Sequence, residues 1–145
     1  MSHVRQQIRE AAAAAVTGLV TAGSRVYQSR LHPLDATKLP CLLVNTDDES
    51  IDGLMIGSPD ILDRKLTLSI RAVAKASANL DDTLDTMAAE IETALGVSTL
   101  GGLVKTLMLD GINIDMEQSD KPVGIATLKY IANYMTVANA PAAAI

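Results

Sequence analysis

The stretch that decides the fold is residues 62–75, LDRKLTLSIRAVAK, in which apolar and polar side chains alternate. A period of two residues is typical of a β-strand with one buried and one exposed face. The stretch therefore predicts a half-buried strand at the centre of a sheet. Its two faces carry four side chains each: Leu66, Leu68, Ile70 and Ala72 on one, and Lys65, Thr67, Ser69 and Arg71 on the other.

Three further segments are predicted to be strands of the same sheet. Pro40 precedes the apolar run Cys41–Thr46, Ile112–Glu117 alternates between apolar and polar residues, and Val123–Val137 forms one long strand. Arg25–Arg30 is a shorter candidate. The sheet is therefore expected to have about four strands.

Two segments have the apolar spacing of helices. They cover Val4–Val20, which contains five consecutive alanines, and Leu80–Leu95, which lies between Asn79 and Gly96. The order of elements predicts an α+β fold, with an antiparallel sheet, both helices packed on one face, and a projecting hairpin or loop arm. We expect a single domain over residues 1–145, with 138–145 as a loose C-terminal tail.

The expected arm follows from the length of the central strand. Residues 62–76 would reach ~50 Å if fully extended, at ~3.3 Å per residue. A small sheet cannot cover that length, so the strand bulges or projects with Thr46–Asp60. The turn signals Asp52-Gly53 and Gly57-Ser58-Pro59 mark the tip. Large apolar residues at a loop tip predict contact with a partner, and here they are Ile51, Leu54, Met55 and Ile56.

The composition argues against two classes of partner. The chain has 145 residues, with 12 Lys and Arg against 17 Asp and Glu, no Trp, no Phe and three Tyr. A net charge of −5 and so few aromatic rings do not suit a protein that grips nucleic acid. The longest charge-free runs, residues 11–24 and 130–145, are shorter than the ~20 residues of a membrane span, and we expect no membrane partner.

Candidate catalytic, cofactor-binding and metal-binding residues are not found. His3 and His32 are the only histidines, and Cys41 is the only cysteine and is expected to be a buried filler. Residues 96–101 have the glycine spacing of a phosphate-binding loop, but Gly102 stands where that loop needs a lysine. The sequence therefore predicts a protein without enzymatic activity and without a cofactor.

Two groups of charged residues have alternative interpretations. Arg25 and Arg30 flank the short candidate strand, either as solvated edge charges or as partners of carboxylates on a neighbouring subunit. The acidic cluster could be the solvated entrance of a hairpin, or an electronegative channel or rim surface facing DNA. A weak divalent-cation site is a further alternative, although the spacing of these residues matches no calcium-binding loop. The members of this cluster are Asp47, Asp48, Glu49 and Asp52.

Most of the chain, from about residue 4 to 137, resembles the tail terminator family of long-tailed phages, of the minor tail protein U type. The likeness lies in the amphipathic first helix, the alternating strand that ends at Lys75, the acidic start of the second helix, and a set of shorter motifs. These motifs are Arg25-Val26-Tyr27 with Arg30 and Pro33, Leu39–Val44, Asp47-Asp48-Glu49, and the final strand with Tyr130 and Tyr134.

The resemblance implies a structural virion protein at the head-proximal end of the tail, assembled in the host cytoplasm. Members of such a family form a ring of six subunits that caps the tail tube, ends tube polymerisation and offers a joining surface to the head connector. The implied partners are other copies of the chain, the tail tube protein and the head–tail connector protein, with DNA passing through unbound. The alternatives are another head–tail completion or tail-tube ring protein, or a small-ligand-binding α+β domain.

Overall fold

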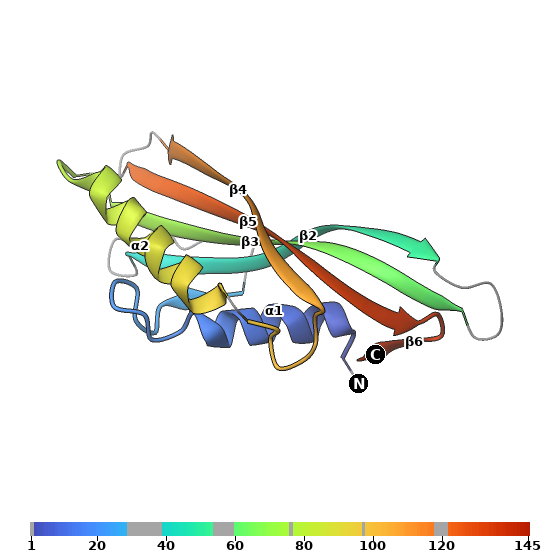
Figure 1. Ribbon diagram of the computed structural model, residues 1–145. Helices are drawn as coiled ribbons and strands as arrows, with labels where there is room; N and C mark the ends of the chain where they lie inside the picture. Colours follow the sequence, from blue (N-terminus) through green and yellow to red (C-terminus); the bar gives the residue numbers. More distant parts are fainter. Residues whose placement is uncertain (1, 29–38, 54–59, 76, 97, 118–121) are drawn as a thin grey trace.

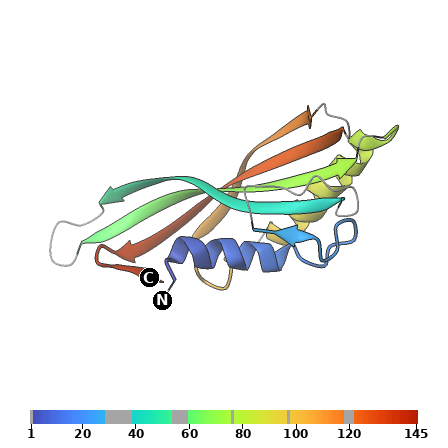
Figure 2. The same ribbon diagram turned by 180° about the vertical axis from the view of Figure 1, so that it is seen from behind.

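The protein consists of a long, twisted sheet with two helices on one of its faces (Figure 1). The computed structural model describes residues 2–28, 39–53, 60–75, 77–96, 98–117 and 122–145. The helices are α1 (Val4–Ala15) and α2 (Leu80–Leu95). Seen from behind, the opposite face of the sheet carries neither α1 nor α2 (Figure 2). We call these the helix face and the open face.

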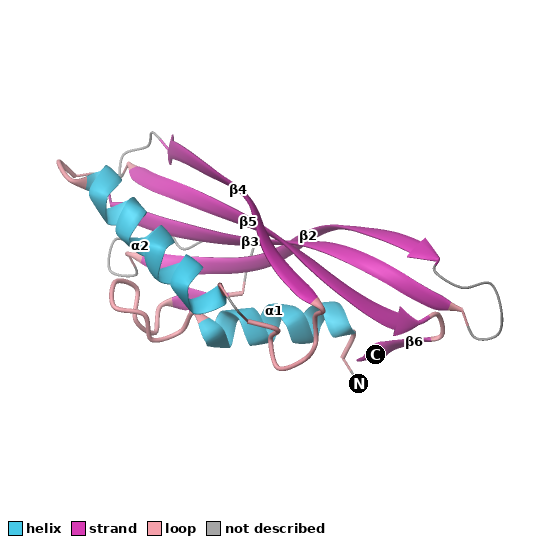
Figure 3. Ribbon diagram, in the orientation of Figure 1, coloured by secondary structure: helices cyan, strands magenta, loops and turns pink. Residues whose placement is uncertain are grey.

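The sheet has six strands in the order β1-β2-β3-β5-β4, and β6 also pairs with β5 (Figure 3). β1 runs parallel to β2, and every other pair is antiparallel. β3 and β5 form the centre and pair along fifteen consecutive positions. The strands are β1 (Val26–Tyr27), β2 (Cys41–Gly53), β3 (Ile61–Lys75), β4 (Thr106–Glu117), β5 (Val123–Val137) and β6 (Ala140–Ala144).

The predicted fold class, an α+β fold with an antiparallel sheet of about four strands, is wrong. The sheet is mixed and six-stranded, and strands make up about half of the chain. β1 lies within the shorter candidate Arg25–Arg30, but only Val26 and Tyr27 pair, and they pair in parallel with Leu42 and Leu43 of β2. β6 falls where the sequence predicts a loose tail, because its residues, APAAA, have little β-propensity. Pairing with Thr136 and Val137 of β5 holds it instead.

The helix boundaries agree with the sequence at α2 and differ at α1. α2 covers the predicted Leu80–Leu95. α1 ends at Ala15, and the chain then forms a tight loop in which Gly18 and Gly23 have φ angles of +89° and +61°. His3 is the N-cap of α1, since its Nδ1 accepts a hydrogen bond from the Arg5 N–H at 3.0 Å.

The main core lies between the helices and the helix face. It combines the apolar sides of α1 and α2 with alternate residues of the strands, including the predicted Leu66, Leu68, Ile70 and Ala72. A smaller cluster covers one end of the open face and contains Leu39, Cys41, Leu43, Val73 and Val123. Cys41–Val44 is therefore buried on both faces, and the prediction of a buried Cys41 is confirmed.

A β-bulge interrupts β2 at the acidic cluster. Thr46 pairs with Leu68 and Glu49 pairs with Leu66, so Asp47 and Asp48 together lie opposite a single residue of β3. The extra residue turns Glu49 to the helix face, whereas strict alternation after Thr46 would point it to the open face. Beyond the bulge β2 continues to Gly53, so residues 50–53 of the expected arm are strand. Figure 1 shows that this end of the β2–β3 hairpin projects past both helices.

Candidate interaction surfaces

Cys41 and His3, two side chains of types that often act in catalysis, stabilise the fold in this protein. Burial raises the pKa of the Cys41 thiol, which keeps it protonated and unreactive. His3 caps α1. Within the described ranges, no three His, Cys, Asp or Glu side chains come together as metal ligands. In the same part of the chain no helix is both long and apolar enough to cross a membrane.

Glu49 differs from the other members of the acidic cluster because its side chain is buried. It is 6% exposed and links three elements. Its Oε2 accepts hydrogen bonds from Arg64 of β3 at 3.1 Å and from Arg5 of α1 at 3.2 Å. Its Oε1 accepts one from the hydroxyl of Tyr134 on β5. Glu49 is therefore occupied within the fold and is not part of an acidic outer surface.

Arg64 completes this buried network. Its side chain is 7% exposed, and its Nε donates to Thr136 Oγ1 at 3.0 Å. The guanidinium carbon also lies 5.9 Å from the centre of the Tyr134 ring. Burial, together with the adjacent Glu49 carboxylate, raises the pKa of Tyr134. Sequence reasoning missed the network because the bulge, which no residue pattern marks, is what brings Glu49 to this face.

Asp47 and Asp48 are exposed where β2 borders the open face. Asp47 accepts hydrogen bonds from Asn45 and from the Ser69 hydroxyl. The two carboxylates line a shallow polar hollow with Thr67, Asp110 and Lys129. Asp52 is exposed further along β2. The structure therefore brings Asp47 and Asp48 together on an outer surface, with a lysine beside them, and separates them from Glu49.

Arg25 lies at the start of β1, half-buried. Its Nε donates to the Pro40 carbonyl at 2.8 Å and its Nη2 to the Thr21 carbonyl at 3.5 Å. These contacts hold the chain between α1 and β1 against the start of β2. Arg30, the other predicted interface arginine, lies outside the described residues. So do Leu54, Met55 and Ile56 of the predicted arm, whereas Ile51 is on β2 and 48% exposed.

An exposed apolar surface on β4 has no counterpart among the residues predicted to be functional. Ile112, Ile114 and Met116 pair with Leu128, Ala126 and Gly124 of β5 and so face the helix side. They are 44%, 50% and 48% exposed, because α2 packs over β3 and β5 and stops short of β4. The alternation of Ile112–Glu117 could have located this surface, but it predicts a half-buried strand.

These features are typical of a subunit of a larger assembly. The protein has one sheet layer and one helix layer, and its described surface presents strand edges and exposed apolar patches to which other chains can bind.

Comparisons with known proteins identify the family. The family model of phage minor tail protein U matches residues 3–134, so the chain belongs to that family. The resemblance expected from the sequence is thereby confirmed, and the chain is a structural protein of the phage tail. Among solved structures, a chain of the "Virion of native gene transfer agent (GTA) particle" is 18% identical with a TM-score of 0.40, covering 92% of each chain. No curated protein matches the chain.

Proposed function

We propose that this protein assembles into a ring on the end of the tail tube, where it stops tube polymerisation and offers the surface that joins the tail to the head. The family match over residues 3–134 supports this proposal, since it makes the chain a phage tail protein. In this role the protein lies at the head-proximal end of the tail, and it assembles there in the host cytoplasm.

A ring of one kind of subunit needs two different surfaces that meet head to tail. A sheet whose two outermost strands lie on opposite sides supplies such a pair. The two edges here are β1, with Arg25 beside it, and β4. A closed ring of six copies, in contact with the tube protein on one side and with the connector protein on the other, is the assembly we infer.

The acidic surface suits a channel through which DNA moves. The chain carries a net charge of −5, and Asp47, Asp48 and Asp52 are exposed on one strand. Carboxylates repel phosphates, so a channel or rim lined by them lets DNA slide without binding. Glu49 is excluded from this role because Arg64 and Arg5 neutralise it within the fold.

The projecting end of the β2–β3 hairpin is the proposed contact with the tube. Ile51 is 48% exposed on this end of β2. An apolar side chain on a projecting hairpin has no partner within the monomer's core and gains most by burial against another chain. The hairpin therefore supplies a third surface, separate from the two edges that would close the ring.

Polymerisation of purified tube protein tests the proposal. Adding the protein at the start of polymerisation should shorten the tubes, and gold-labelled antibody should mark one end of each tube. Label along the whole length would instead make the protein a tube subunit. Tubes of unchanged length without label would contradict the proposal.

A further inference from the structure

The outer edge of β4 is exposed along the whole strand. β4 ends the sheet, and no strand of the described residues pairs with its outer side. Twelve residues at ~3.4 Å each give an edge about 40 Å long. Monomeric proteins protect such edges with short strands, prolines, charged side chains or bulges, because free N–H and C=O groups recruit another chain. β4 is long and contains no proline and no lysine, and its one irregularity lies between Leu109 and Gly111, which leaves Ile112–Glu117 in regular register with β5.

The side chains on the helix side of this edge form a continuous apolar row. We call them the β4 row. Each pairs with a β5 residue of the helix face, so all four point the same way. Their exposed fractions lie between 37% and 50%, which is unusual for four neighbouring large apolar residues. The members are Leu109, Ile112, Ile114 and Met116.

On the opposite side of the molecule a tight loop presents a single apolar side chain. Hydrogen bonds from the Gly18 N–H to the Gly23 carbonyl and from the Gly23 N–H to the Leu19 carbonyl, both 2.8 Å, close the loop. Val20 stands at its tip and is 94% exposed. We call residues 18–23 the Val20 loop.

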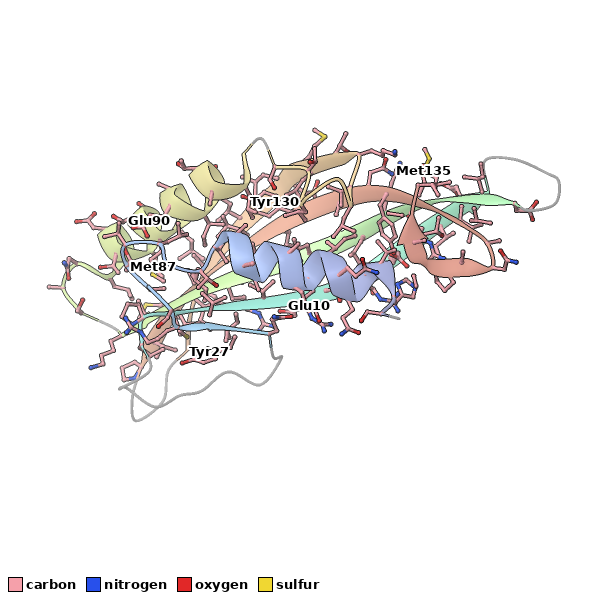
Figure 4. All side chains as sticks on the ribbon, turned by 90° about the horizontal axis from the view of Figure 1, so that it is seen from below. Glu10, Tyr27, Met87, Glu90, Tyr130 and Met135 are labelled. Atoms are coloured by element: carbon pink, nitrogen blue, oxygen red, sulfur yellow. The ribbon has the colours of Figure 1, made fainter. Side chains whose placement is uncertain are left out.

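The Val20 loop is fixed to the helix layer. Both the N–H and the hydroxyl of Thr21 donate to the carboxylate of Glu90, at 3.1 and 2.7 Å. Glu90 belongs to α2 (Figure 4). Beside Val20, a mostly apolar groove runs along α2 past Ala89 and Ala94. The hydrogen bonds to Glu90 therefore fix the Val20 loop, with its exposed apolar side chain, in the helix layer on the side of the molecule away from β4.

The two edge strands differ in charge. β4 carries Asp110 and Asp115 and no basic residue. Residues 18–28, which contain the Val20 loop and β1, carry Arg25 and no acidic residue, and the carboxylate beside the loop, Glu90 of α2, accepts two hydrogen bonds from Thr21. The acidic residues of β4 disfavour contact of β4 with itself, and Arg25 beside β1 favours contact between β4 of one copy and β1 of the next.

We propose that β4 of one copy docks beside β1 of the next copy, with the Val20 loop of that second copy covering the β4 row. The helices of one copy do not cover β4, and the Val20 loop belongs to the helix layer at the opposite, β1 side of the molecule. When β4 of one copy lies beside β1 of the next, the Val20 loop of that next copy therefore covers the exposed β4 row. This assignment rests on the proposed ring and names the surfaces that close it. The contact is heterologous, as a closed ring requires.

Three lysine variants of the full chain test the assignment: Ile114→Lys on the β4 row, Val20→Lys on the loop, and Ile145→Lys as a control. Ile145 is 46% exposed, close to the 50% of Ile114, and lies on neither surface. Native mass spectrometry over rising concentration should show oligomers for the wild type and the control. It should show monomers for Ile114→Lys and Val20→Lys, with melting temperatures within a few degrees of the wild type.

Mixing the two defective variants gives the sharper result. Val20→Lys keeps an intact β4 row and Ile114→Lys keeps an intact Val20 loop, so together they retain one complete contact. The mixture should form a one-to-one heterodimer and nothing larger. Homodimers of Val20→Lys would mean that β4 pairs with itself, which overturns the proposal.

The outcomes also separate this assignment from the proposed function. If both variants assemble like the wild type while the protein still caps tubes, the ring is retained and these surfaces are not its contacts. If the wild type stays monomeric at all concentrations, the assignment is overturned. Failure of the wild-type protein to cap tubes would count against the proposed function instead.

Discussion

The hydroxyl of Tyr134 donates a hydrogen bond to the carboxylate of Glu49 on the helix face of the sheet. The two residues are 85 positions apart in the chain. The contact exists because the bulge at Asp47 and Asp48 inserts one extra residue into β2, so that the side chain of Glu49 points to the helix face and not to the open face. A residue from the most acidic stretch of the sequence thus becomes a buried acceptor that ties β2, β3, β5 and α1 together.

Glu49→Gln should lower the free energy of unfolding by about 3 kcal/mol, because it leaves the guanidinium of Arg64 buried without its countercharge. Urea denaturation measures the change. Asp48→Asn is the matched control, since it removes the neighbouring exposed carboxylate and should change stability by less than about 0.5 kcal/mol. Equal effects of the two variants would contradict the structural role of Glu49.

Removal of the phenolic hydroxyl should have different effects at the two buried tyrosines of β5. Tyr134→Phe breaks a hydrogen bond to a charged group and should cost about 2 kcal/mol. The hydroxyl of Tyr130 is buried with no hydrogen-bond partner among the described residues, so Tyr130→Phe should be neutral or slightly stabilising. Comparing the two variants in one urea series decides the point, and a larger loss for Tyr130→Phe would refute it.

The same tyrosines make the fold sensitive to alkali. Burial raises the pKa of Tyr130 to about 12, with a further contribution from the charge of Glu92. A phenol whose pKa is higher in the folded than in the unfolded state stabilises the fold below the unfolded value of ~10. That stability should be lost as pH rises from about 10 to 12. Melting temperatures across this range measure it, and Tyr130→Phe should flatten the decline.

The start of α1 should respond to mild acid. Burial, assisted by the positive charges of Arg5 and Arg64, lowers the pKa of His3, and its neutral Nδ1 accepts the Arg5 N–H. Stabilisation by this cap is present above the unfolded value of ~6.5 and is lost as pH falls through the lower folded value. His3→Ser supplies a cap that does not titrate. Its melting temperature should exceed that of the wild type more at pH 5 than at pH 8, and an equal difference would contradict the cap.

Asp48 and Asp52 test the channel surface. Virions with Asp48→Lys and Asp52→Lys should release DNA more slowly at low salt, because each lysine near the DNA path gains a phosphate contact that salt weakens. Asp81→Lys with Asp82→Lys, on the first turn of α2, gives the same net charge elsewhere. Equal release rates for the two double variants would remove these aspartates from the channel.

Much of the scaffold follows from local patterns in the sequence. The alternation in residues 62–75 and 123–137 gives β3 and β5, and the apolar spacing between Asn79 and Gly96 gives α2. These elements are long and each has one buried face, so periodicity alone defines them. The resemblance to the tail protein family also rests on these patterns.

The rest depends on contacts that no local pattern records. β6 is held by backbone pairing to β5 and not by the propensity of its own residues, and nothing in the local sequence of β1 indicates that it pairs in parallel with β2. The bulge in β2 inserts one residue and changes the face of Glu49, although Asp47-Asp48-Glu49 reads as a solvated turn. The apolar residues of β4 have the alternation of a strand with one buried face, and they are exposed only because α2 packs on β3 and β5 and does not cover β4.

Tail length in the virion tests the central claim most directly. A phage that lacks this gene should produce tails of uncontrolled length in electron micrographs. Complementation with the wild-type protein should restore a single length, and complementation with Val20→Lys, whose substitution lies outside the core, should not. Tails of normal, uniform length in the absence of the protein would contradict its role in ending tube growth.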